Sequence, residues 1–294
     1  MKITLPRRID KWTLAHRATA TLFLALLILG RSDGFPFLKG SAASTRLFDL
    51  IPFADPLAAL EAMLASRQFT LTLLIATGLL IGLYAIIGRA FCGWLCPLGL
   101  LLELNDELRT RVNRFLRRRK KSLPDFQFPR NTKYVLLVTF LLLSFLIQLP
   151  IFQIVSPINS LARSFIFGPE VGLSLVGAIV ASEYFSRRAW CIALCPLGAL
   201  YSIIGRFALV RIQIDQQKEK SGKMCGACAT HCPMQIQVLE DHIKQGRNAV
   251  DNPDCTRCGA CMDGCPRDSL RLGIRFRGRD SSQTPNQLAE KSDV

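Results

Sequence analysis

The sequence predicts an α-helical membrane protein, with four spanning helices arranged as a duplicated pair and a small cysteine-rich domain after them. Half of the 294 residues are hydrophobic and the mean hydropathy is +0.26, yet the formal net charge is +15. The apolar residues fall in long runs with basic residues between them, which is typical of membrane proteins with cationic loops. The chain also holds 11 cysteines, an odd number in a chain too long for a small disulfide scaffold.

Four apolar runs are candidates for spanning helices, which need about 20 apolar residues to cross the hydrocarbon core. In chain order they are residues 12–30, 69–87, 134–155 and 170–185. The second and third are the clearest, and the fourth is short. The first carries His16 and Arg17, which we expect to reach the headgroups. Four buried helices of a soluble protein are the alternative, which the length of the two best runs disfavours.

The charge of the loops predicts the orientation. The segment between Arg109 and Arg130 is strongly basic, including the run RRRKK, whereas the segment after the third run holds only Arg163. This alternation favours a bacterial inner-membrane protein with both termini in the cytoplasm. A basic cluster beside the membrane is more simply a topology signal that attracts anionic lipid than a nucleic-acid site, so we expect no nucleic-acid partner.

Two segments of the chain repeat each other closely. GRAFCGWLCPLGLL begins at Gly88 and RRAWCIALCPLGAL begins at Arg187, and each follows an even-numbered apolar run. The chain therefore reads as a tandem duplication of a helix pair, each ending in Cys-x3-Cys-Pro. Its four cysteines are Cys92, Cys96, Cys191 and Cys195. They either form a four-thiolate metal or redox site, which we favour, or are buried structural thiols.

Seven cysteines gather between positions 225 and 265. The second group has the spacing C-x2-C-x2-C-x3-C-P, which matches the bacterial [4Fe–4S] motif at every position: Cys255, Cys258, Cys261 and Cys265. A zinc site usually joins two C-x2-C units over longer gaps, so zinc is disfavoured. The sequence thus predicts a small ferredoxin-like domain with two [4Fe–4S]-type groups.

The first group is one cysteine short. It contains Cys225, Cys228 and Cys232, and its first ligand position is occupied by Gly222. Crossed ligation, in which the fourth cysteine serves the neighbouring cluster, gives one complete set: Cys255, Cys258, Cys261 and Cys232. The other set, Cys225, Cys228 and Cys265, lacks a ligand. It predicts a three-iron cluster, a four-iron cluster with an outside ligand, or no cluster. His231 could be that ligand, although an ordinary histidine on the loop surface is the simpler interpretation.

The composition divides the chain into three parts. We expect a membrane domain over residues 1–205, a ferredoxin-like domain over 206–275 and a polar, disordered tail over 276–294.

Nearly the whole chain resembles the NapH family of polytopic ferredoxin-type proteins, which includes the related MauN proteins of methylamine utilisation. The resemblance rests on FCGWLCPLG, WCIALCPLGALYS, the C-terminal cysteine groups and the segment LFDLIPFADPL. It implies a quinol dehydrogenase component rather than a stand-alone enzyme. Such a component passes electrons from quinol, with a partner ferredoxin-type protein, toward a periplasmic enzyme such as nitrate reductase or methylamine dehydrogenase. Gly222 departs from the family's pattern and puts the second cluster in doubt.

Iron–sulfur centres are the redox groups that the residues indicate, because three histidines cannot supply the paired axial ligands of a multi-haem quinol oxidase and no C-x2-C-H motif occurs. We assign no catalytic residue and no quinone pocket. Asp49, Asp55 and Glu183 could take protons, although plain interfacial charges are the simpler interpretation. The alternative function is a metal-handling or assembly factor, since related proteins with Cys-x3-Cys-Pro pairs are implied in copper delivery. The sequence leaves the terminal enzyme, the direction of electron flow and the oligomeric state open.

Overall fold

The computed structural model describes residues 10–29, 38–41, 44–47, 51–67, 71–119, 126, 128–161, 172–216, 218 and 225–274. Most of these residues are helical. The α-helices are α1 (Lys11–Leu29), α2 (Pro56–Ser66), α3 (Leu71–Ile87), α4 (Ala90–Trp94), α5 (Pro97–Arg118), α6 (Thr132–Ile147), α7 (Ile151–Val155), α9 (Gly172–Ser182), α10 (Pro196–Gly205), α12 (Ala227–His231) and α13 (Ala260–Asp263). Two π-helical turns, which often mark functional sites, are η1 (Trp190–Leu194) and η2 (Leu239–Ile243).

The strands form two small antiparallel sheets. The first is a meander of β1 (Leu38–Ser41), β2 (Ser44–Leu47) and β3 (Ile51–Ala54). The second pairs β4 (Val210–Ile214) with β5 (Leu270–Ile274), so that the two ends of the cysteine-rich segment lie side by side.

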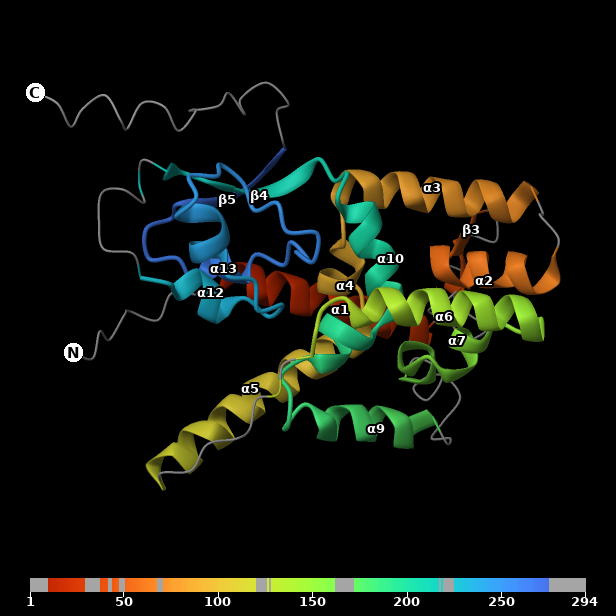
Figure 1. The fold of residues 1–294 in the computed structure, drawn as a ribbon, viewed down its shortest axis with the longest axis horizontal. Coiled ribbons are helices and arrows are strands. Elements are labelled where there is room, and N and C mark those ends of the chain that lie inside the picture. Colours follow the sequence, from red (N-terminus) through yellow and green to blue (C-terminus); the bar gives the residue numbers. More distant parts are fainter. Residues whose placement is uncertain are drawn as a thin grey trace, which may run out of the picture.

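The helical part packs around its own apolar core. Helix α10 lies against α3 and α6, and α2 packs against the same two helices, while α5 extends away from them (Figure 1). Fully buried side chains at the centre of this core include Leu57, Leu98, Leu102, Leu197 and Tyr201. The cysteine-rich part has a second core, in which apolar side chains surround several of the cysteines.

The predicted architecture of four membrane-spanning helices is wrong. Among the described residues, no helix combines the length and the apolar character that crossing a membrane requires. Helices α3, α6 and α9 are apolar but have 17, 16 and 11 residues, and the longer α1 and α5 carry charged side chains. The most apolar of these helices are therefore short, and the two longest helices carry charged residues.

The third apolar run shows the physical reason for this difference. Helix α6 ends at Ile147, Gln148 takes a left-handed conformation with φ of 59°, and Pro150 precedes the short α7. Proline has no N–H to donate and clashes with the preceding turn, so the run is divided rather than continuous. The prediction counted apolar residues and gave these two interruptions too little weight.

The N-terminal helix joins the two parts of the molecule. The amides of Trp12 and Thr13, in the first turn of α1, donate to the carboxylate of Asp263 at 3.2 and 2.8 Å, and the Thr13 hydroxyl donates to it at 3.0 Å. The Trp12 side chain also lies so close to Gly259 that a Cβ there would come within 2.7 Å of it. Helix α1 is therefore fixed at its start to the loop that carries the C-terminal cysteines.

Candidate functional site

The cysteines of the complete predicted cluster set line one cavity, called here the ferredoxin cavity. They are Cys232, Cys255, Cys258 and Cys261. Between the last two, Gly259 adopts φ of +81°, which lets the chain turn directly into α13. Ile212 and Val250 add apolar walls. Thiols gathered in an apolar space fit a [4Fe–4S] cubane, and this ligand set stays a prediction.

The incomplete set is distributed differently. Cys228 and Cys265 are buried in the core of the cysteine-rich part, whereas Cys225 is exposed. The Cys265 sulfur lies 3.2 Å from the Ser269 hydroxyl. Gly222 lies outside the described residues. The His231 ring is exposed and donates through Nδ1 to the Ala227 carbonyl at 2.9 Å, so one of its nitrogens already has a partner within its own helix.

The two Cys-x3-Cys-Pro pairs meet at a second cavity, called here the inter-repeat cavity. All four of their cysteines line it, together with apolar side chains such as Leu98 and Leu197. The Cys96 thiol lies within electrostatic range of Cys92, Cys191 and Cys195. Burial raises the pKa of the Cys191 and Cys195 thiols to about 12. The duplication in the sequence therefore brings its cysteines together in space.

Within the part of the chain that the structure describes, no three His, Cys, Asp or Glu side chains are grouped so as to hold a metal ion. Eight of the cysteines line one or both of the two cavities, and Cys225, Cys228 and Cys265 line neither.

Each repeat also places the second sulfur of its pair at the start of a helix. Cys96 accepts from the amide of Gly99 at 3.4 Å before α5, and Cys195 accepts from the amide of Gly198 at 3.3 Å before α10. The conformation follows from the proline after each cysteine, because proline is well suited to the first turn of a helix. Both sulfurs consequently lie at the partly positive end of a helix.

Cations stand beside the thiols in both halves. Arg89 and Arg188 each precede the first cysteine of their pair by three positions, are 1% and 6% exposed, and line the inter-repeat cavity. Several of their nitrogens have no hydrogen-bond partner among the described residues: Nε of Arg89, and Nε and one terminal nitrogen of Arg188. The buried indole nitrogen of Trp190, which also lines the cavity, likewise has no hydrogen-bond partner among the described residues. Buried donors without partners are costly, so the cavity suits an anionic or acceptor-rich occupant.

The two cavities are neighbours. Cys258 and Thr256 line the inter-repeat cavity as well as the ferredoxin cavity. Backbones also approach closely, since a Cβ on Gly93 would lie 2.8 Å from the Thr256 carbonyl oxygen. The Trp94 indole donates to the Arg257 carbonyl at 3.2 Å. Helix α4, which carries Cys92, is therefore in direct contact with the loop that carries Cys255 and Cys258.

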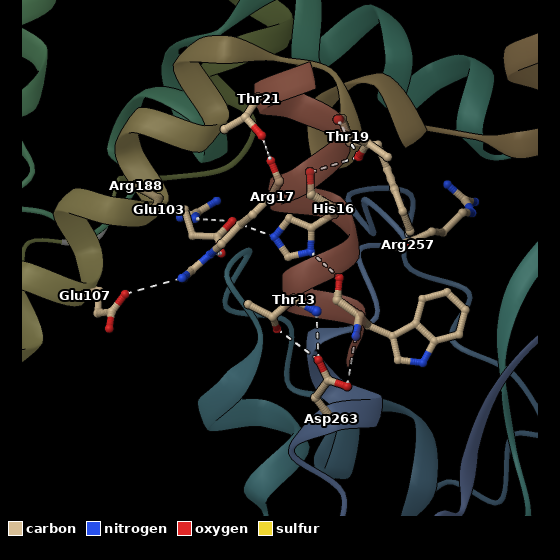
Figure 2. Close-up of polar contacts among 12 residues, drawn as sticks. Thr13, His16, Arg17, Thr19, Thr21, Glu103, Glu107, Arg188, Arg257 and Asp263 are labelled. Carbon is tan, nitrogen blue, oxygen red and sulfur yellow. Dashed lines mark hydrogen bonds and ion pairs between the residues drawn. The ribbon is translucent and has the colours of Figure 1, made fainter. Parts of the chain in front are cut away.

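A histidine–carboxylate pair lies at the other wall of the inter-repeat cavity (Figure 2). His16 donates through Nδ1 to the Trp12 carbonyl at 2.9 Å, and its Nε2 lies 2.8 Å from Glu103 Oε2. The other oxygen of Glu103 accepts from Arg17 at 2.7 Å. Burial alone would raise the pKa of Glu103, but the hydrogen bonds from His16 and Arg17 outweigh it and lower this pKa. The side chains expected at headgroups instead face a partner on α5.

The candidate proton-accepting carboxylates have separate surroundings. Desolvation raises the pKa of Asp55 to about 7, although its carboxylate accepts from Leu57 and Tyr201. Desolvation likewise raises the pKa of Glu183 to about 7, against a hydrogen bond from the amide of Arg188. Asp49 lies outside the described residues. Both described carboxylates can therefore exchange protons near neutral pH.

Sequence reasoning did not single out the charged groups that connect these sites. Arg89, Arg188, Glu103 and Asp254 were not among the candidate residues. The two arginines had a signal in the sequence, since both lie inside the repeated segments. Glu103 and Asp254 had none, because their partners are distant along the chain.

Comparisons with known proteins agree with the two groups of cysteines. A family model described as "4Fe-4S binding domain" matches residues 69–124 and 167–214, which contain both Cys-x3-Cys-Pro pairs. A model described as "4Fe-4S dicluster domain" matches residues 222–270. No solved structure is significantly similar to the chain.

Related proteins align along nearly the whole chain. The methylamine utilization ferredoxin-type protein MauN of Methylorubrum extorquens is 30% identical over 273 residues, 92% of this chain and 91% of that protein. The ferredoxin-type protein NapH of Haemophilus influenzae is 31% identical over 89% of each chain. NapH of Escherichia coli is 31% identical over 92% of this chain and 91% of its own. The resemblance predicted from the sequence is confirmed.

Proposed function

Because the chain belongs to the NapH and MauN family of ferredoxin-type proteins, we propose that it passes electrons between the quinone pool and a partner ferredoxin-type protein. The partner in turn serves a periplasmic redox enzyme, of a nitrate reductase or methylamine dehydrogenase system. In this role the chain is a component of a quinol dehydrogenase rather than a complete enzyme.

One observation carries the proposal: the four cysteines that crossed ligation selects all line the ferredoxin cavity. An iron–sulfur cluster supplies single-electron transfer, whereas a quinol releases two electrons and two protons. The protein's own residues must therefore hold the cluster, accept protons and keep water away. Asp55 and Glu183 are suited to the second task, because each has a pKa of about 7.

Contact with lipid, and a position at the bacterial inner membrane, are part of this proposal because quinones are lipid-soluble. Large apolar side chains are exposed on α3 and α6, among them Leu71 and Leu146, which are each 73% exposed. Exposed apolar surface of this kind is typical of an interaction face.

Anaerobic reduction of the purified full-length protein by a short-chain quinol tests the proposal. We expect the quinol to bleach the cluster absorption and to produce the EPR signal of a reduced cluster, without any partner protein present. C255S should lose this response, because Cys255 is a ligand of the complete set. The exposed carboxylate variant E240Q is the control and should respond as the native protein does.

Two results would contradict the proposal. In one, dithionite reduces the clusters and quinol leaves them oxidised, which removes quinol as the donor. In the other, quinol reduces them only when the partner is added, which makes the chain an anchor for the partner rather than a carrier.

A further inference from the structure

A third cavity, called here the junction cavity, lies where the helical part meets the cysteine-rich part. We propose that it binds the ring of a quinol, with Phe126 and Phe128 beside the ring and Asp241 as the acceptor of a hydroxyl proton. The inference rests on the proposed function, because it names the place where the electron donor of that function binds. It also makes Asp241 a catalytic residue.

The junction cavity has room for a small ring molecule. Its volume is about 400 Å³, within the usual range for ligand sites of about 300–1,000 Å³. Its floor is apolar, since Ala189, Ile192, Ala193 and Ile236 line it and are at most 7% exposed. Two of these residues, Ile192 and Ala193, belong to the π-helical turn η1, a kind of turn that often occurs at functional sites. An apolar floor of this kind suits an uncharged ring.

The rim of the junction cavity carries aromatic rings and polar side chains. Phe126 and Phe128 line it and are 64% and 50% exposed, so their rings are available to a ligand. Gln237 and Asp241, which are both exposed, and the half-buried Asn252 line it from the cysteine-rich part. Among the described residues, the Asp241 carboxylate and the Gln237 amide have no hydrogen-bond partner. The rim thus offers a surface for an aromatic ring, a donor for a carbonyl oxygen and an acceptor for a hydroxyl group.

The charges at the junction cavity disfavour a ligand that carries phosphate groups. Arg187 lines the cavity but donates to both oxygens of Asp106, at 2.8 and 2.7 Å. Arg130, the other arginine of the lining, lies 3.4 Å from the Asp254 carboxylate and donates to two backbone carbonyls at 3.1 and 2.9 Å. Since both cations already have partners and Asp241 adds a negative charge, the described lining favours a neutral ring over a nucleotide.

The junction cavity lies against both groups of cysteines. Ile192 directly follows Cys191, the first cysteine of the second Cys-x3-Cys-Pro pair. Ile236 lines the junction cavity and the ferredoxin cavity alike. The backbone carbonyl of Asn252 accepts from the amide of Cys255 at 3.1 Å. A ring bound here therefore lies beside the ferredoxin cavity and against the chain segment that carries Cys191.

This position suits a donor that releases two electrons. Oxidation of a quinol to a quinone breaks two O–H bonds and yields two protons and two electrons. The Asp241 carboxylate takes one proton as general base, and water at the open rim takes the other. The electrons leave one at a time, to oxidised iron–sulfur clusters held by the cysteines. Because Asp241 is exposed, it returns its proton to the solvent between turnovers.

Photolabelling of the oxidised full-length protein with a short-chain azido-ubiquinone tests the site without any electron transfer. Mass spectrometry should place the label within residues 126–130 or 235–241, and an excess of decylubiquinone should prevent the labelling. F126A/F128A removes both rings, so the dissociation constant for decylubiquinone should rise about tenfold or more. F115A removes a similarly exposed ring from α5, outside the cavity, and should bind decylubiquinone as the native protein does.

A further variant separates proton transfer from binding. D241N keeps the shape of the side chain but cannot take a proton, so decylubiquinone should bind with native affinity while reduction of the clusters by decylubiquinol slows about 100-fold or more. E240Q changes the neighbouring carboxylate, which pairs with Lys244 and does not line the cavity, and should keep the native rate. Dithionite should reduce the clusters of every variant alike, which shows that each has folded and holds its clusters.

Three results would overturn the inference. The label could lie only outside the junction cavity, F126A/F128A could bind decylubiquinone as tightly as the native protein, or D241N could be reduced at the native rate. If decylubiquinol still reduces the native clusters in these cases, the proposed function stands and its assigned site is wrong. If decylubiquinone does not bind and decylubiquinol leaves the clusters oxidised, both proposals fail.

Discussion

Arg89 and Asp254 form a buried ion pair that joins the two cysteine sites, with 2.7 Å between a terminal guanidinium nitrogen and Oδ1. Arg89 lies three positions before Cys92, and Asp254 directly precedes Cys255. The same carboxylate accepts from Lys133 on α6 and from Ser202 on α10. The position of the C-terminal cluster loop is therefore set by two cations and one hydroxyl on three separate parts of the helical domain.

Replacing Asp254 by Asn leaves the buried cations Arg89 and Lys133 without their shared countercharge. Breaking a buried pair in this way typically costs about 3–5 kcal/mol, so D254N should unfold at markedly lower denaturant concentration than the native protein. The control is E240Q, which breaks an exposed i,i+4 pair with Lys244 and should cost about 0.5 kcal/mol. Equal stabilities of D254N and E240Q would show that Asp254 does not hold the loop.

The close approach of Gly93 to the cluster loop predicts a specific steric effect. An added methyl group at Gly93 meets the Thr256 carbonyl oxygen at 2.8 Å, so G93A should force α4 and the loop apart at a cost of about 1–3 kcal/mol. Gly78 on α3 has nothing within 4 Å of its Cβ position, and G78A should stabilise the helix by up to about 1 kcal/mol. Thermal unfolding should show a lower melting temperature for G93A and a higher one for G78A than for the native protein. A stable G93A protein would mean that the two segments are not in contact.

The hydrogen bonds between α1 and Asp263 predict local fraying when they are removed. D263A leaves the amides of Trp12 and Thr13 without their acceptor, and loss of such a helix cap costs about 1 kcal/mol. Hydrogen exchange should accelerate in the first turn of α1 and remain unchanged in α10. If exchange at Trp12 and Thr13 stays at the native rate, α1 is held by other contacts.

Glu183 predicts a dependence of stability on pH. Its pKa rises from 4.5 to about 7 on folding, chiefly by desolvation, with Arg188, Arg109 and Asp106 as the charges that face it. Between these values the folded state holds a proton that the unfolded state has lost, so the contribution of Glu183 to stability falls as pH rises from about 4.5 to about 7.

E183Q should remove that part of the pH dependence. Melting temperatures measured from about pH 5 to about pH 8 should decline less with rising pH in E183Q than in the native protein. E107Q, an exposed carboxylate variant on α5, should keep the native profile. Parallel profiles for E183Q and the native protein would refute a raised pKa.

The sequence could group the cysteines because the information in their spacing is local. Ligand spacing within a loop can be read directly, and the repeated Cys-x3-Cys-Pro segment indicated two equivalent pairs. Both sets now lie around cavities, Cys255 with Cys232 and Cys92 with Cys191. Their roles as ligands stay predictions.

The sequence was misleading where the position of a side chain depends on a partner far along the chain, or where a helix ends inside an apolar run. His16 and Arg17 were expected to face headgroups, but Glu103 lies 87 and 86 positions away and pairs with both. No local pattern reveals such a partner. The apolar runs were counted as membrane spans because their length was given more weight than the residues that interrupt them. Gln148 and Pro150 interrupt the third run.

The hydrogen bond between Thr13 and Asp263 joins two residues that are 250 positions apart in the chain, and this separation has a consequence for biosynthesis. A ribosome makes the first helix long before it makes Asp263, so the hydrogen bonds between the first turn of α1 and this carboxylate form only after the cluster loop has been made. Loop closure over such a distance is slow. The start of the first helix therefore takes its final place late, even though His16 and Arg17 can pair with Glu103 earlier.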